Sequence, residues 1–147
     1  MAHSRSKIWV HAILGVKHRE ALITSEIEQP VHDIVKSEFE KCNCVLDCLN
    51  GTTNHLHTLF LLHPDCSIRQ VIKQVKGASS HAINRSDLMQ QKFAWQVGFA
   101  AFSVSESRVP VIRAYISRQK EHHRKVSYEE EYKRVMLLLG LVLEFEE

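Results

Sequence analysis

Apolar side chains recur along this chain with two distinct periods. Every second residue from Ile8 to Val16 is apolar, a pattern typical of a half-buried β-strand. After Ser67, apolar residues follow the three- and four-residue spacing of an amphipathic helix, at Ile68, Val71, Ile72, Val75, Ala78, Ala82 and Ile83. The chain therefore contains both strands and helices.

The rest of the chain carries the same two patterns, with recognisable element ends. Thr24 or Ser25 can cap a helix, Pro110 suits the first turn of another, and Ser127 can cap the last. The turn formers at 50–54 join two strands as a hairpin. In chain order, the predicted elements are strand 8–16, helix 24–41, strand 44–49, strand 56–62, helix 67–83, strand 99–105, helix 110–123 and helix 127–141.

The order of these elements predicts the architecture. The first six form a split βαβ unit of the ferredoxin-like kind, so we expect an α+β fold with a four-stranded antiparallel sheet and helices on one face. The helix at 110–123, which bears Tyr115, follows as a C-terminal addition. No linker or repeat divides the sequence, and its 147 residues are expected to form one domain, 1–147.

Composition narrows the class of protein. The formal net charge of +2 does not by itself indicate nucleic-acid binding, so any basic surface must arise from the arrangement of residues. No apolar run approaches the length of a membrane span, and no signal peptide is evident, so we expect a cytoplasmic protein without membrane contact. Cys42, Cys44, Cys48 and Cys66 lack the paired spacing of zinc sites and are expected to be reduced structural thiols.

Two small groups of residues carry candidate chemistry. His55 and His57 lie two apart at the start of a strand, so both imidazoles share one face and could bind a divalent ion. Tyr115 and Gln119 lie four apart on a helix, with His122 further along the same face. A phenol can act as a nucleophile, and two imidazoles with an amide oxygen suit Mg²⁺ or Mn²⁺. Taken singly, each group also fits a purely structural role.

Together these motifs resemble the single-tyrosine HUH transposases of the insertion-sequence 200-like family. His55-Leu56-His57 is similar to that family's His-hydrophobe-His motif, and Tyr115 to Gln119 with the trailing His122-His123 is similar to its tyrosine helix. The stretches 76–80 and 93–105 resemble family segments in the same order, although Asn54 stands where an Asp is common. The resemblance implies that Tyr115 is the nucleophile and that His55, His57 and Gln119 bind the metal.

Candidate DNA contacts come from basic residues. Arg69, Lys73 and Lys76 form one stripe on the helix that follows Ser67, and a solvated polar face is the alternative interpretation. Arg113 and Arg118 flank Tyr115 and could position a phosphate. Two aromatic residues could stack on unpaired bases, although a buried anchoring role is the more common one for such residues: Trp95 and Phe99.

The resemblance implies a transposase that cuts and rejoins single-stranded DNA through a 5′-phosphotyrosine, with subterminal hairpins as binding sites. It also implies a homodimer in which Tyr115 completes the histidine site of its own chain or of its partner. No nucleotide cofactor is expected, because transesterification conserves the bond energy. Two alternatives stay open: a non-catalytic, domesticated protein that only binds hairpins or single strands, and a nickase of the relaxase or replication-initiator type.

Overall fold

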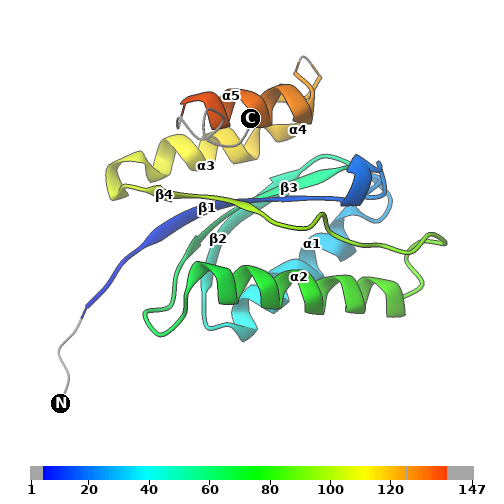
Figure 1. Ribbon diagram of the computed structural model, residues 1–147, viewed down its shortest axis with the longest axis horizontal. Coiled ribbons are helices and arrows are strands. Elements are labelled where there is room, and N and C mark those ends of the chain that lie inside the picture. Colours follow the sequence, from blue (N-terminus) through cyan, green and yellow to red (C-terminus); the bar gives the residue numbers. More distant parts are fainter. Residues whose placement is uncertain (1–4, 125, 139–147) are drawn as a thin grey trace, which may run out of the picture.

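A four-stranded sheet organises the molecule, as the computed structural model of residues 5–124 and 126–138 shows (Figure 1). The strands are β1 (Trp9–Gly15), β2 (Val45–Gly51), β3 (His55–Leu61) and β4 (Ala100–Val104). Their order is β2-β3-β1-β4, and every neighbouring pair is antiparallel. This order confirms the predicted ferredoxin-like α+β fold.

The main apolar core lies between one face of the sheet and two helices, α1 (Glu28–Lys41) and α2 (Ile68–Arg85) (Figure 1). Period-two alternation sends Val10, Ala12 and Leu14 of β1 to this face, where they are fully buried. Ser67 begins α2 with a capping box, because its hydroxyl accepts from the Gln70 backbone while the Gln70 side chain accepts from the Ser67 backbone. The helix predicted after Ser67 is therefore confirmed.

The opposite face of the sheet is covered by α3 (Val109–Ser117), α4 (Gln119–His122) and α5 (Tyr128–Leu138) (Figure 1). The side chains that β1 and β3 turn toward these helices are partly polar, and include His11, His55 and His57. Two small apolar clusters, one around Trp9 and one around Ile13, lie on this same face. Short 3₁₀ turns, Lys17–Arg19 and Glu106–Arg108, follow β1 and β4.

Two predicted helix boundaries are wrong, for local physical reasons. The first helix begins at Glu28 rather than at 24 or 25, because Pro30 is tolerated only in a first turn and would clash with a carbonyl further inside a helix. The helix predicted at 110–123 is broken at Arg118, whose backbone angles of −99° and 14° leave the helical range. The end of the last predicted helix, 139–141, lies outside the described residues.

No helix among the described residues is both long and apolar enough to cross a membrane.

Candidate active site

The histidine pair of β3 lies at the centre of the candidate site. His55 and His57 are both fully buried, while Leu56 between them points into the main core on the other face. This alternation follows from the period of a strand and confirms the predicted placement of both rings on one face. Gln119 is also fully buried, and its Oε1 lies 3.2 Å from His55 Nε2. The structure therefore brings Gln119 to the histidine pair.

A carboxylate from α5 occupies the middle of this group. Glu131 Oε1 lies 2.8 Å from His57 Nε2, 3.1 Å from His123 Nε2 and 3.5 Å from His55 Nε2. Three imidazole nitrogens from two separate segments of the chain therefore converge on one oxygen.

The second oxygen of the same carboxylate faces the candidate nucleophile. The Tyr115 hydroxyl donates a hydrogen bond to Glu131 Oε2, and Gln119 Nε2 lies 3.3 Å from that oxygen. His122 Nε2 approaches it to 3.1 Å. Although the helix is broken at Arg118, Tyr115 and Gln119 still meet at one point, as their spacing predicted.

The charge states follow from burial and from these contacts. Burial opposes ionisation of Glu131, but the ring nitrogens of His123, His55 and His57 hold its pKa far below the usual value. Burial lowers the pKa of His55 and of His57, more than the neighbouring Glu131 raises it. Burial and the Glu131 contact raise the pKa of Tyr115, so the phenol keeps its proton in this arrangement.

Polar neighbours behind the two histidines fix the orientation of their rings. His55 Nδ1 lies 2.9 Å from Asn54 Oδ1 and 3.0 Å from Thr52 Oγ1, and a proton on Nδ1 would be donated to the amide oxygen. His57 Nδ1 lies 2.8 Å from His11 Nε2, and burial lowers the pKa of His11 to about 3. Asn54, which stands where an Asp is common in the resembled motif, thus has its amide oxygen beside the His55 ring.

These donors fit a divalent cation. In the tautomer that carries its proton on Nδ1, His55 directs the lone pair of Nε2 toward Gln119 Oε1 and Glu131 Oε1, which are also acceptors. Acceptors that face one another repel unless a positive charge lies between them. Four residues among those described offer ligand atoms within 4.8 Å of one another: His55, His57, His123 and Glu131.

Glu131 was not identified from the sequence, and His123 was noted only as part of the trailing histidine pair. A pattern does mark Glu131, since it lies three residues after Tyr128, on the side of its helix that an amphipathic pattern assigns to apolar residues. A charged residue at such a position is unusual and is often functional.

The predicted basic stripe lies away from this site. Arg69 and Lys73 are exposed on α2, which covers the other face of the sheet (Figure 1). Lys76 donates to the backbone oxygens of Gln96 and Gly98, at 2.5 Å each, and so holds the segment before β4. The structure does not bring these three residues to Tyr115.

The arginines near Tyr115 differ in their contacts. Arg113 makes a bidentate pair with Asp47, with both N···O distances 2.8 Å. Arg118 is exposed and lines an open groove on the outer side of α3 together with Tyr115 and His122. This groove gives an extended ligand access to the phenol.

The remaining candidates have structural surroundings. Trp95 is buried and donates to Ser79 Oγ at 2.9 Å, which confirms its role as an anchor, whereas Phe99 is 41% exposed. The cysteines are free thiols, and of the four only Cys44 is buried.

Comparison with known proteins identifies the class. A family model described as "Transposase IS200 like" matches residues 4–119. No curated protein sequence matches the chain. The solved structure of a protein named as a "putative transposase" from Deinococcus radiodurans R1 is 22% identical, with a TM-score of 0.66 over 81% of this chain and 95% of that one. A REP-associated tyrosine transposase bound to a REP hairpin is 14% identical, with a TM-score of 0.56 over 87% of this chain and 76% of that one.

At these identities the likeness to solved structures establishes a shared fold. The match to the family model extends over most of the sequence and places the chain among the DNA transposases. The chain belongs to the IS200-like transposase family.

Proposed function

We propose that this protein cuts and rejoins single-stranded DNA by metal-dependent transesterification, with Tyr115 as the nucleophile. The observation that carries the proposal is the meeting of Tyr115 with Gln119 and the β3 histidines around one carboxylate. Tyr115 lies on α3 and His57 on β3, so only the folded chain assembles this group. Such convergence of a phenol and several imidazoles is not needed for packing.

In the proposed reaction, Tyr115 Oη forms a bond to the scissile phosphorus and the P–O3′ bond breaks. The products are a 5′-phosphotyrosine and a strand with a free 3′-OH, and the 3′-OH of a second strand later reverses the exchange. A Mg²⁺ or Mn²⁺ ion bound by His55, His57 and Gln119 would polarise a non-bridging phosphate oxygen. No nucleotide cofactor is required.

The chain's own residues set up this step. Glu131 Oε2 accepts the hydrogen bond of the Tyr115 hydroxyl and so fixes the direction of the phenol oxygen. Asn54 and His11 hold the two histidine rings in their orientation. Arg118 at the groove is placed to contact the backbone of a bound strand.

Substrate recognition extends the proposal. The REP-associated relative was solved with a hairpin bound, and we propose hairpin-bearing single strands as the substrate of this chain also. Arg69 and Lys73, which are exposed on α2, remain candidate phosphate contacts on the other face of the sheet, whereas the Lys76 amine is engaged by the backbone oxygens of Gln96 and Gly98. Arg69 and Lys73 would bind the body of a hairpin rather than the scissile phosphate.

The test is a covalent-adduct assay. The full chain is incubated with Mn²⁺ and a hairpin-bearing single strand that is labelled in turn at its 3′ and its 5′ end. Label from the 3′ end should travel with the protein in a denaturing gel, because the tyrosine keeps the 5′ phosphate of that fragment. His57→Ala, checked for folding by circular dichroism because His57 is fully buried, should form no adduct. Binding of the hairpin without any adduct from the wild type would favour the non-catalytic alternative.

We also propose a homodimer. The edge strands of the sheet are β2 and β4, and either offers unpaired backbone groups to a second copy. Within one chain Tyr115 already lies at its own histidine site, so the arrangement described here is the one in cis. Tyr115→Phe protein mixed with His55→Ala/His57→Ala protein should stay inactive in this arrangement. Recovery of cleavage would show exchange of the tyrosine helix between chains, and a monomer in sedimentation would exclude the dimer.

A further inference from the structure

We propose that the metal centre is a site for a first-row transition ion, of the Mn²⁺ to Zn²⁺ series, held by His123 and Glu131 in addition to His55 and His57. This inference rests on the metal site of the proposed function. It adds two ligands from the C-terminal part of the chain and excludes Mg²⁺ as the preferred ion.

The first support is the convergence of donor atoms. The ring nitrogens of His55, His57 and His123 and a Glu131 oxygen lie within 4.8 Å of one another, in a region where the Glu131 side chain is 2% exposed. The donors come from β3, from the end of α4 and from α5. A cation among these largely buried donors would balance the charge of Glu131 and take up the lone pairs of the imidazoles.

The second support is His123. Its Nε2 is buried and makes no hydrogen bond with the residues described, although Glu131 Oε1 lies only 3.1 Å away. The angle at the ring therefore does not suit a proton on the line between the two atoms. A buried polar nitrogen without a hydrogen bond is rare in proteins and requires an explanation, which a bound ion supplies.

The third support is the orientation of His55. Asn54 Oδ1 lies 2.9 Å from His55 Nδ1, and the tautomer that donates to it leaves the lone pair of Nε2 facing Gln119 Oε1. A metal-binding histidine is held in this way, with its second nitrogen bonded to an acceptor behind it. The surroundings of His55 therefore suit a metal ligand.

The chemistry of this donor set selects the ion. Mg²⁺ prefers oxygen ligands and retains water, whereas the affinity of imidazole nitrogens rises from manganese through cobalt to nickel, and zinc also binds imidazole well. Three imidazoles and one carboxylate form a nitrogen-rich set, in contrast to two imidazoles and an amide oxygen. The addition of His123 and Glu131 therefore moves the preference away from Mg²⁺.

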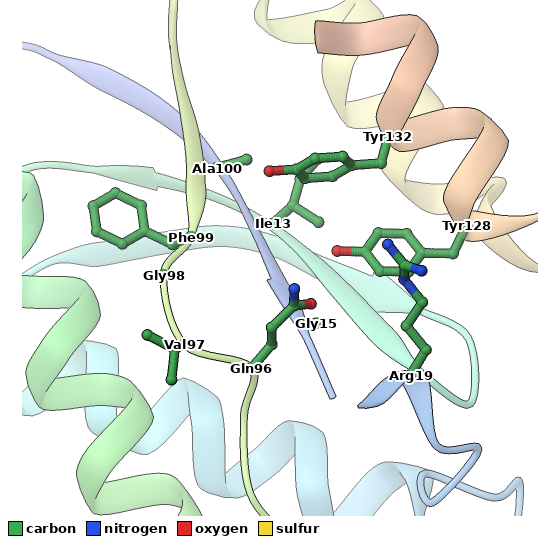
Figure 2. Close-up of a pocket in the computed structure, with 10 residues that line it drawn as sticks. All are labelled: Ile13, Gly15, Arg19, Gln96, Val97, Gly98, Phe99, Ala100, Tyr128 and Tyr132. Carbon is green, nitrogen blue, oxygen red and sulfur yellow. The ribbon is translucent and has the colours of Figure 1, made fainter. Parts of the chain in front are cut away.

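The position of Glu131 depends on how α5 docks. Tyr128, at the start of α5, stacks on His55 with ring centroids 4.1 Å apart and planes 7° apart. Figure 2 shows Tyr128 and Tyr132 standing over Gly15 and Ile13 of β1, with Arg19 beside Tyr128. A Cβ at Gly15 would lie 2.9 Å from the Tyr128 hydroxyl, so this glycine allows the close approach of α5. The docked helix delivers its carboxylate to the histidines.

The experiment uses the full chain, stripped with a chelator and dialysed. Co²⁺ is titrated into the protein and visible absorption is recorded, since histidine-rich cobalt sites have intense bands. Thermal unfolding is then measured at equal concentrations of Mg²⁺, Mn²⁺, Co²⁺ and Zn²⁺. We expect one equivalent of Co²⁺ to bind, and micromolar transition ions to raise the unfolding temperature where the same concentration of Mg²⁺ does not.

Variants test the two added ligands. His123→Asn and Glu131→Gln should each weaken Co²⁺ binding by about 100-fold or more and change the absorption bands, because each removes one ligand. His81→Ala, at an exposed histidine of α2, is the matched control and should bind as the wild type does. Circular dichroism of the metal-free variants reports whether each folds. If Glu131→Gln does not fold, Co²⁺ binding by His123→Asn alone tests the proposal.

Equal stabilisation by Mg²⁺ and Co²⁺ would overturn the inference, as would unchanged Co²⁺ binding by His123→Asn. The adduct assay separates this inference from the proposed function. Tight Co²⁺ binding without cleavage of any strand leaves the metal site standing and removes the transposition chemistry. If the protein cleaves DNA with Mg²⁺ and His123→Asn cleaves it equally well, the proposed transposition chemistry stands and the inferred metal ligands are wrong.

Discussion

Tyr115→Phe tests the proposed nucleophile with the smallest possible change, the loss of one oxygen atom. The ring keeps its contacts in the apolar cluster around Trp9, so no cavity forms. Covalent attachment of DNA should fall to background, because a phenyl ring cannot attack phosphorus. Binding of the hairpin should change little, since the phenol oxygen is the only atom removed.

The same variant should lower stability by an amount that the contacts of Glu131 allow us to work out. A hydrogen bond to a charged group contributes roughly 1.5 to 3 kcal/mol. Glu131 Oε2 keeps the Gln119 Nε2 donor at 3.3 Å, so the carboxylate oxygen is not left without a partner. We therefore expect a loss of about 1 to 2 kcal/mol, at or below the lower end of that range. For a chain of this size the loss corresponds to a fall in Tm of about 2 to 8 °C.

Adduct formation is measured on a denaturing gel with a labelled hairpin strand and Mn²⁺, and Tm by calorimetry. Tyr132→Phe is the matched control, because Tyr132 lies on α5 and lines the pocket of Figure 2. It should retain the adduct. An adduct of normal yield from Tyr115→Phe would refute the assignment of the nucleophile. An unchanged or higher Tm would refute the stabilising contact between its hydroxyl and Glu131.

Further variants test the surface and the buried charges. Asp47→Asn frees Arg113 from its bidentate pair, so the affinity for single-stranded DNA should rise. The slope of log affinity against log salt concentration should steepen by about 0.7, as measured by fluorescence anisotropy at several salt concentrations. Lys76→Ala should lower Tm because two backbone oxygens lose their donor. Lys73→Ala should change the free energy of unfolding by less than about 0.5 kcal/mol and make the salt slope of DNA binding shallower by about 0.7. Burial lowers the pKa of His32 below its usual 6.5, so the unfolded chain takes up a proton first and the folded chain loses stability as pH falls below 6.5. His32→Gln should reduce this loss by up to about 1.4 kcal/mol per pH unit, measured by urea unfolding at pH 7 and pH 5.

Local patterns were sufficient for much of the fold. The α2 helix follows from apolar spacing and from the Ser67 cap, and the shared face of His55 and His57 follows from the two-residue period of a strand. Both depend only on residues that are close in sequence. The order of the elements then restricted the topology to the ferredoxin-like arrangement.

The composition of the site was less accessible, because it depends on packing between distant segments. Glu131 lies 74 positions after His57, and only the docking of α5 against β1 brings the two together. Lys76 shows the same limit, since its helical stripe suggested a DNA contact while its amine binds the oxygens of Gln96 and Gly98. The helical spacing of basic residues carries no information about which backbone groups lie opposite them.

The two faces of the sheet differ in what holds their helices, and this difference should be visible in amide hydrogen exchange. Below the sheet, α1 and α2 share the large apolar core, whereas α4 and α5 meet β3 largely through buried histidines and one carboxylate. Amides of α4 and α5 should therefore exchange through a local opening of lower free energy than the opening that exposes β1 and β3. The two helix layers that flank the sheet should therefore behave as units of unequal cooperativity.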